Sequence, residues 1–252
     1  MSKEIEFKIK LTKKEAENVI LRLNAECMTF PFETVLKTDD YWKSKDGASA
    51  KQGQVIRLRS EYEIGPITMD VLCNDNVEVN VFNQIENDLL FKWFFDEKQP
   101  ELNILNKLPR RSFVTYKQKA FAGNSEVNSE YEASLFNSHE PENVIPDVVE
   151  RCFDALGTRY FSKIKRCCSL HDIPYDTPKG KSHSGTINID VDNVNNMYYF
   201  EIEFIPDGIE DANDVLDQDE ILDILENVVS RYGINPENKD KRPWVEILGI
   251  NK

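Results

Sequence analysis

Charged and apolar residues alternate with a period of two in several segments of the chain. The first such segment runs from Glu4 to Leu11, where a charged residue occupies every second position and an apolar residue lies between. Successive side chains of a β-strand point to opposite faces of the sheet. The segment is therefore predicted to be a strand with one charged face and one apolar face.

The same layout returns at 55–62, 112–120, 126–135, 160–170, 186–194 and 198–205, and a shorter strand is predicted at 38–43. Between these segments, apolar residues recur at helical spacing over 13–27, 141–156 and 219–232. The first helix is preceded by a capping box, Thr12 with Glu15, whereas Gly157 and Gly233 are suited to left-handed positions after the other two.

Residues 63–111 interrupt this series of strands. Within them, 85–95 fits either a helix or a buried apolar strand. A segment this short makes a poor core of its own. We therefore predict one domain over 1–252, with an elaboration inserted at about 63–111.

The charged faces of the strands carry acids and bases in similar numbers. The acids are Glu4, Glu6, Glu130, Glu132, Asp190, Asp192, Glu201 and Glu203. The bases are Lys8, Arg57, Arg59, Lys117, Lys119, Lys163 and Lys165. A closed sheet would enclose these groups in a lumen, whereas an open sheet covered by helices on one side would expose them to water. Solvated faces usually include Thr, Ser and Gln, so the many ionised pairs favour enclosure.

Charges enclosed in a lumen restrict the kinds of ligand that the protein can bind. Buried ions cost several kcal/mol each unless they are paired or coordinated. So many lysines and arginines suit a polyphosphate, and so many carboxylates suit a hard divalent cation, Mg²⁺ or Mn²⁺.

Composition narrows the class of protein further. The 252 residues carry a formal net charge of -14, which argues against a broad surface for nucleic acid or anionic membranes. The chain shows neither a run of 18 apolar residues nor a signal-peptide pattern, so a cytoplasmic location is expected. Five cysteines without a Cys-x-x-Cys pair suggest neither a zinc site nor a disulfide framework, and the three histidines are expected on the surface.

The charged motifs resemble those of a known family. The Glu-x-Glu-x-Lys of residues 4–8 is similar to the signature of the CYTH superfamily, the triphosphate tunnel metalloenzymes, which includes class IV adenylyl cyclases and thiamine and inorganic triphosphatases. Further motifs follow in the family's order: Ile-Arg-Leu-Arg at 56–59, Thr-Tyr-Lys-Gln-Lys at 115–119, Glu130 with Glu132, Lys-Ile-Lys-Arg at 163–166, Ile-Asp-Val-Asp at 189–192 and Phe-Glu-Ile-Glu at 200–203.

The resemblance implies an α+β fold in which helices surround an eight-stranded antiparallel β-barrel, the triphosphate tunnel, with a charged lumen. The implied triphosphate ligands are Lys8, Arg57, Arg59, Lys117, Lys119, Lys163, Lys165 and Arg166. The implied metal ligands are Glu4, Glu6, Glu130, Glu132, Asp190, Asp192, Glu201 and Glu203. Of these residues, Glu4, Glu6, Lys8, Glu201 and Glu203 are expected to carry the catalysis.

The expected function is a Mg²⁺- or Mn²⁺-dependent hydrolase of a small triphosphate such as ATP, another nucleoside triphosphate, tripolyphosphate or thiamine triphosphate. A class IV adenylyl cyclase and a non-catalytic nucleotide or polyphosphate sensor remain the alternatives. The segment 242–248 resembles the end of the cyclase branch, although Trp244 and Leu248 could equally pack on the barrel. The natural substrate stays open, as does the question of a monomer or a homodimer.

Overall fold

The alternating segments form the strands of a closed antiparallel barrel. The computed structural model describes residues 2–26, 32–48, 54–64, 87–96, 110–122, 125–137, 144–176, 184–206 and 218–249. The strands in these ranges are β1 (Ser2–Leu11), β2 (Phe32–Ser44), β3 (Gln54–Glu63), β4 (Arg110–Ala122), β5 (Ser125–Asn137), β6 (Gly157–Asp176), β7 (Ser184–Val194) and β8 (Met197–Pro206).

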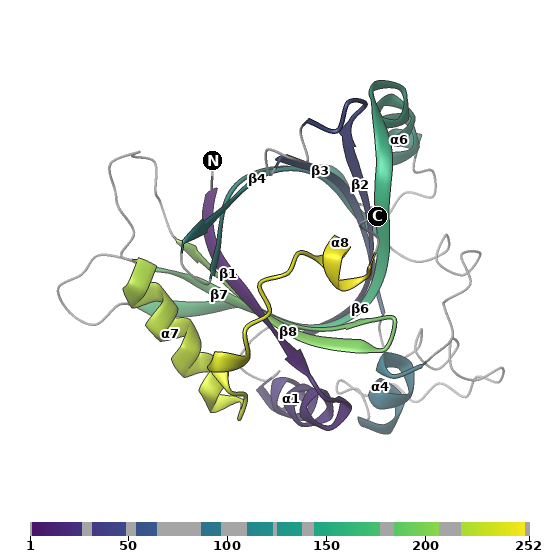
Figure 1. The fold of residues 1–252 in the computed structure, drawn as a ribbon. Helices are drawn as coiled ribbons and strands as arrows, with labels where there is room; N and C mark the ends of the chain where they lie inside the picture. Colours follow the sequence, from purple (N-terminus) through teal and green to yellow (C-terminus); the bar gives the residue numbers. More distant parts are fainter. Residues whose placement is uncertain are drawn as a thin grey trace.

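Around the barrel the strands follow the order β1-β5-β4-β3-β2-β6-β7-β8, and β8 pairs with β1 to close it (Figure 1). Every pair of neighbouring strands is antiparallel. The predicted eight-stranded antiparallel barrel is therefore confirmed, and the open sheet that the alternation also allowed is excluded.

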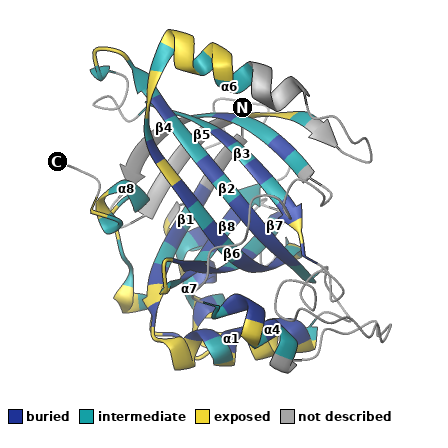
Figure 2. Ribbon diagram, turned by 90° about the vertical axis from the view of Figure 1, so that its right-hand side faces the viewer, coloured by how far each residue is buried: buried dark blue, intermediate teal, exposed yellow. Residues whose placement is uncertain are grey.

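Helices cover part of the outer surface of the barrel. They are α1 (Lys13–Glu26), α4 (Asn87–Phe94), α6 (Val144–Leu156) and α7 (Gln218–Arg231). A short 3-10 helix, η1 (Pro236–Asn238), follows α7, and α8 (Trp244–Ile247) lies at one end of the barrel (Figure 1). Figure 2 shows α1 and α4 beside one end of the barrel, with buried residues on the sides that face the rest of the protein.

The hydrophobic core lies between the outer face of the sheet and these helices. Ile5, Phe7 and Ile9 of β1 belong to it, together with apolar residues of β7, β8, α1, α4 and α7. Fully burying one such side chain is worth about 1.5–3 kcal/mol. Because the apolar face of each of these strands points outward to the helices, its charged face points into the barrel.

Two local predictions about helix ends are confirmed and one is wrong. Thr12 and Glu15 form the capping box, in which the Glu15 N–H donates to Thr12 Oγ1 (3.2 Å) and the Thr12 N–H donates to Glu15 Oε2 (2.7 Å). Gly233 follows α7 with a left-handed φ of 78°. Gly157 instead begins β6, where an added Cβ would lie 2.6 Å from the Lys43 carbonyl oxygen, so close strand contact explains the glycine.

The predicted insertion is only partly described. Its segment 85–95 contains the helix α4 rather than a strand, and Phe94 of this helix is fully buried in the core. Asn193 of β7 donates to the Phe94 carbonyl oxygen (2.5 Å), which ties the helix to the barrel. Residues 65–86 and 97–109 lie outside the described ranges, so a single domain with an insertion stays a prediction.

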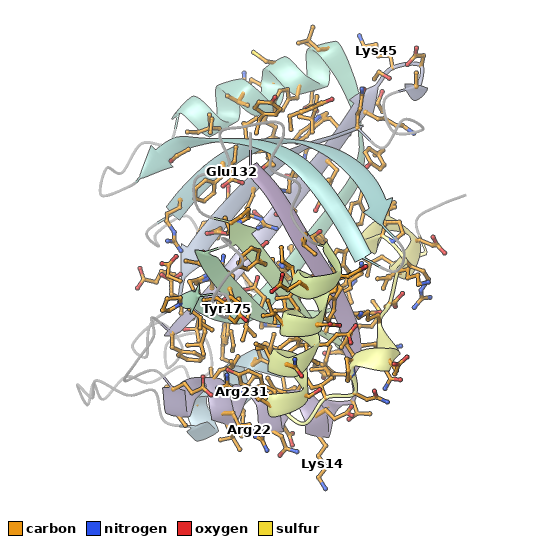
Figure 3. All side chains as sticks on the ribbon, turned by 90° about the vertical axis from the view of Figure 1, so that its left-hand side faces the viewer. Lys14, Arg22, Lys45, Glu132, Tyr175 and Arg231 are labelled. Carbon is orange, nitrogen blue, oxygen red and sulfur yellow. The ribbon has the colours of Figure 1, made fainter. Side chains whose placement is uncertain are left out.

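A hydrogen bond joins helix α1 to the C-terminal end of helix α7. Arg22 of α1 donates to the carbonyl oxygen of Arg231 at the end of α7 (2.5 Å; Figure 3). Within the ranges given above, none of the helices is long and apolar enough to cross a membrane.

The capping box gives a test of the first helix. Thr12→Ala should lower the free energy of unfolding by about 1 kcal/mol, because the Glu15 N–H loses its side-chain acceptor. Urea denaturation followed by circular dichroism measures the change. Thr12→Ser keeps the hydroxyl and should unfold close to the parent protein; equal losses in both variants would contradict a capping role.

Candidate active site

Bases predominate on one half of the inner face of the barrel and acids on the other, although Lys8 of β1 lies among the acids and Asp39 and Glu61 lie among the bases. We call the first the basic wall; its described bases lie on β2, β3, β4 and β6 and are Lys37, Arg57, Arg59, Arg111, Lys163 and Lys165. We call the second the acidic wall; its described acids lie on β7, β8, β1 and β5 and are Asp190, Asp192, Glu201, Glu203, Glu6 and Glu132. Opposite charges therefore face each other across the lumen.

Lys165 lies at the junction of the two walls, on β6 next to β7. Its Nζ is 2.6 Å from Asp192 Oδ2, 3.3 Å from Glu201 Oε2 and 3.8 Å from Asp190 Oδ2, and its side chain is only 2% exposed. Burial would lower the pKa of Lys165, but the three carboxylates outweigh it and hold this pKa well above the usual value. The ammonium is thus a fixed positive charge among three acids.

The partner acids respond differently to this charge. Burial raises the pKa of Asp192 to about 6, in spite of Lys165. Burial would also raise the pKa of Glu201, but the surrounding lysines, Lys165 foremost, hold it below the usual value. Asp192 is therefore the carboxylate in this group that gains a proton most readily.

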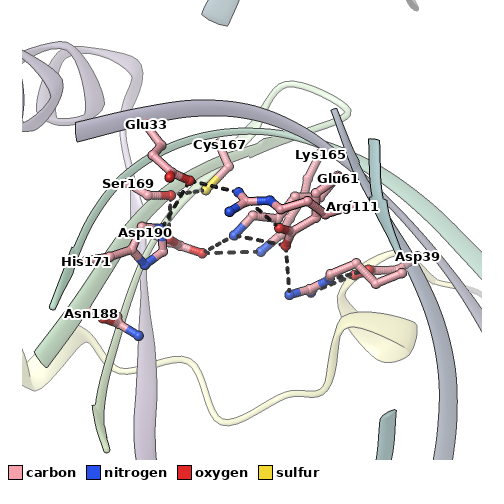
Figure 4. A network of polar contacts seen from close by, with 12 residues as sticks. Glu33, Asp39, Glu61, Arg111, Lys165, Cys167, Ser169, His171, Asn188 and Asp190 are labelled. Carbon is pink, nitrogen blue, oxygen red and sulfur yellow. Dashed lines mark hydrogen bonds and ion pairs between the residues drawn. The ribbon is translucent and has the colours of Figure 1, made fainter. Parts of the chain in front are cut away.

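Asp190 is fully engaged on both of its oxygens (Figure 4). Its Oδ1 accepts from Ser169 Oγ (2.6 Å), and its Oδ2 accepts from Lys37 Nζ (2.9 Å). Burial would raise the pKa of Asp190, but Lys37 and Lys165 hold it well below the usual value. Lys37 also lies 3.9 Å from Glu61, which links Asp190 to β3.

Asp39 of β2 binds two bases of the basic wall. Its Oδ1 accepts from Arg59 Nε (2.6 Å), and its Oδ2 accepts from Arg59 Nη2 (3.0 Å) and lies 3.4 Å from Lys163 Nζ. Burial would raise the pKa of Asp39, but these cations hold it well below its usual range. Burial also lowers the pKa of Lys163 to about 7, although the charge of Asp39 opposes this shift.

One further contact connects the two walls, and a pair of acids lies within the acidic wall. Arg57 Nη2 donates to Thr115 Oγ1 (2.9 Å) and to Glu132 Oε2 (3.3 Å), joining β3 to β5. On the acidic wall, Glu6 and Glu203 are register partners on β1 and β8, and Asn188 donates to Glu203 Oε1 (2.9 Å). Like charges opposite one another on neighbouring strands repel, so this pair is a suitable place for a cation.

The C-terminal segment reaches into the site at one end of the barrel, where α8 lies across the opening (Figures 1 and 2). The Asp240 N–H donates to the Lys8 carbonyl oxygen (2.8 Å), and the Tyr199 hydroxyl donates to Asp240 Oδ2 (3.0 Å). Beyond this anchor, Trp244 Nε1 donates to Glu201 Oε1 (2.8 Å), and the Lys163 ammonium lies 4.6 Å from the centre of the indole ring.

Several predicted site residues are thus brought together, but one is not. Arg166 was included with the triphosphate ligands; it lies on the outer face and donates to the Asp96 carbonyl oxygen (2.7 Å). The reason is the period of two, which gives Lys163 and Lys165 one face and Arg166 the other. The backbones of Glu4, Lys117, Lys119 and Glu130 belong to the predicted strands, but their side chains lie outside the described part of the structure.

Sequence reasoning missed the inner face of β2 and part of β6. Lys37, Asp39 and Tyr41 face the lumen, where they contact Asp190, Arg59 and Asp39 respectively, yet the predicted strand began only at residue 38. A period of two read from Lys37 onward could have found them. His171, expected on the surface, lies at the edge of the same network, with Nε2 4.0 Å from Glu33 Oε2.

The donor set fits a hard divalent cation. Carboxylates of β7, β8 and β1 line one side of the lumen, and Asp192 Oδ1 is buried without a hydrogen-bond partner among the described residues. The sulfur of Cys167 and oxygens of Asp190 and Asp192 lie within 4.8 Å of one another. Burial raises the pKa of Cys167 well above its usual value, so its thiol stays protonated and is a poor ligand. Oxygen ligands are what Mg²⁺ and Mn²⁺ prefer.

Comparison with known proteins gives one family and a set of similar folds. A sequence model described as the CYTH domain matches residues 2–243. Among curated proteins, no sequence matches this chain. The PH1819 protein from Pyrococcus horikoshii OT3 is 17% identical with a TM-score of 0.58, and 99% of each chain is covered. A provisionally named adenylate cyclase from Vibrio parahaemolyticus is 10% identical with a TM-score of 0.50, covering 98% of this chain and 97% of its own.

The central lysine gives a test of the network. Lys165→Met should lower the free energy of unfolding by about 3–5 kcal/mol, because it leaves Asp192 and Glu201 buried without their main counter-charge. Urea denaturation in the presence of a chelator measures the effect on the metal-free protein. Lys10→Met removes the same charge from an exposed position of β1 and should change stability by less than about 0.5 kcal/mol. A similar small effect in both variants would contradict the network.

Proposed function

The chain belongs to the CYTH domain family, and we propose that it is a metal-dependent hydrolase of small molecules that carry a triphosphate. The observation that carries the proposal is the division of one closed lumen into a basic and an acidic wall. A polyphosphate anion alone would need only the basic wall. A polyphosphate bound together with divalent cations would need both walls, because carboxylates would hold the cations and basic residues would hold the phosphate.

In this proposal the basic wall binds and orients the triphosphate. Arg57 and Arg59 offer planar guanidinium groups that match phosphate oxygens, and Lys163 adds an ammonium from the neighbouring side of the lumen. All three lie on strands rather than loops, so their backbones are held rigidly by the barrel. Rigid placement of such donors favours the transition state because little rearrangement is needed when charge develops.

The acidic wall would hold divalent cations at two places, through Asp192 and Glu201 beside Lys165 and through Glu6 and Glu203 on the paired strands β1 and β8. When bound, Mg²⁺ or Mn²⁺ supplies Lewis-acid polarisation of phosphate oxygens and neutralises their charge. Asp192 Oδ1 is the described oxygen most suited to this task because no hydrogen bond competes for it. Asp190 is less suited, since Ser169 and Lys37 already engage both of its oxygens.

The assay that tests the proposal separates products. Purified protein is incubated with ATP, tripolyphosphate and thiamine triphosphate in Mg²⁺ or Mn²⁺, and orthophosphate, pyrophosphate and cyclic nucleotide are quantified. Orthophosphate release that depends on the metal is expected. Pyrophosphate with cyclic AMP would make the protein an adenylyl cyclase, and tight binding without any product would make it a sensor; either result overturns the hydrolase.

A carboxylate pair gives the first variant test. Glu203→Gln and Glu6→Gln should each lower kcat on the order of a hundredfold or more, because a neutral amide cannot bind the cation as a carboxylate does. Gln keeps an oxygen that can accept from Asn188, so the fold should be retained, as circular dichroism can check. Glu237→Gln, at an exposed position of η1, is the matched control and should leave kcat unchanged. Full activity in both site variants would contradict their assignment.

The two aspartates of β7 give a second, sharper test. Asp192→Asn should weaken Mn²⁺ binding on the order of tenfold or more, since losing one charged contact costs about 1.5–3 kcal/mol. Asp190→Asn should weaken it less, because Asp190 already binds Lys37 and Ser169. Mn²⁺ affinity is measured by electron paramagnetic resonance titration of the free ion. A larger loss in Asp190→Asn would contradict this choice of ligand.

A further inference from the structure

We propose that Asp39 is a positioning residue that sets the direction in which Arg59 and Lys163 present their N–H groups to the triphosphate. The inference rests on the proposed function and extends it to a residue that binds neither metal nor phosphate itself. Its basis is the contact of the buried Asp39 carboxylate, on β2, with a guanidinium on the adjacent strand β3 and a lysine side chain on the adjacent strand β6.

Asp39 occupies some of the hydrogen-bond donors of Arg59 and leaves the others available. A guanidinium carries five N–H groups in a fixed plane. Asp39 takes the side edge, with Nε on Oδ1 (2.6 Å) and Nη2 on Oδ2 (3.0 Å). The end edge, formed by Nη1 and the second N–H of Nη2, is left for another partner, and Nη1 lies only loosely near Glu61 (3.8 Å). The two hydrogen bonds to Asp39 therefore fix the orientation of the guanidinium, and with it the direction in which the end edge presents its N–H groups.

Asp39 also restricts the position of Lys163. Its ammonium lies 3.4 Å from Asp39 Oδ2 on one side and 4.6 Å from the centre of the Trp244 ring on another. A lysine side chain is long and flexible, so two contacts of this kind restrict where its charge can be. Its side chain is 3% exposed, and that of Asp39 is not exposed at all. One buried carboxylate thus holds both cations.

Asp39 is not placed as a metal ligand. It belongs to β2, within the basic wall, whereas the carboxylates assigned to the cation lie on β7, β8 and β1. Both of its oxygens accept from cations, and the Tyr41 hydroxyl adds a further contact at 3.3 Å. Its role is therefore to orient basic residues.

Two opposite results are conceivable for the removal of this charge. If Asp39 merely competed with phosphate for Arg59 and Lys163, Asp39→Asn would free both cations, make the lumen more positive and tighten the binding of an anion. If Asp39 positions them, the same substitution weakens binding even though the lumen becomes more positive. The sign of the change separates the two roles.

The experiment measures the affinity for tripolyphosphate by isothermal titration calorimetry with Mg²⁺, at a temperature where each variant is folded. Asp39→Asn should weaken binding on the order of tenfold. In the steady state KM should rise more than kcat falls, because the lost contacts orient the phosphate in the ground state as well as in the transition state. Unchanged or tighter binding would overturn the proposal.

Two further variants keep the test decisive. Asp40→Asn is the matched control, since the neighbouring residue lies on the outer face of β2, where its carboxylate pairs with Arg159 and Ser162. It removes the same charge and should leave affinity and KM unchanged. Asp39→Glu keeps the charge on a longer side chain, so it should also weaken binding if geometry matters; wild-type affinity in this variant would contradict positioning. If the parent protein itself does not bind tripolyphosphate, the proposed function fails rather than the role of Asp39.

Discussion

A charge enclosed in a protein must have a counter-charge, and this constraint shapes the whole barrel. Among the residues that the structure describes, five charged residues of the lumen are almost completely removed from water, and each such ion would cost several kcal/mol if it were alone. They are Lys37, Asp39, Lys163, Lys165 and Asp192. The barrel meets the constraint by joining the two walls through Lys165 and Lys37, and by placing Asp39 between Arg59 and Lys163 within the basic wall. A ligand that enters must exchange these contacts for its own, so the ion pairs both stabilise the empty barrel and prepare it for a ligand of mixed charge.

Much of the fold was accessible from local pattern alone. A strict period of two in charged and apolar residues is enough to define a strand with two unlike faces, and it placed Arg57, Arg59, Lys163, Asp192 and Glu201 on one side correctly. The pattern worked because the helices cover the outer face of these strands, so that apolar residues are required there. Where polar residues occupy the outer face of a strand, the alternation no longer shows which residues face the lumen.

Strand β2 is such a strand. Thr38 and Asp40 occupy the outer face of this strand, and Asp40 is stabilised there by Arg159 rather than by apolar packing. Polar residues on both faces make the alternation hard to see, so Lys37 and Asp39 were missed although a period of two read from Lys37 includes them both. The assignment of Arg166 as a triphosphate ligand was wrong for a different reason. A third base beside Lys163 and Lys165 looked like part of the same motif, although it lies on the other face of the strand. The partners of each ion were also beyond prediction, since they depend on contacts between strands such as β2 and β7 that are distant in sequence.

The closure of the barrel by β1 and β8 also determines when the site can exist. Glu6 and Glu203 come from strands near opposite ends of the sequence, and they meet only when these strands pair. A chain emerging from the ribosome makes β1 early but must wait for β8 before the seam can form. Contacts between such distant segments form slowly because a long loop must be ordered first. The cation site should therefore be assembled in one of the last steps of folding, and a nascent chain that stops before β8 would contain the whole basic wall but lack Glu201 and Glu203.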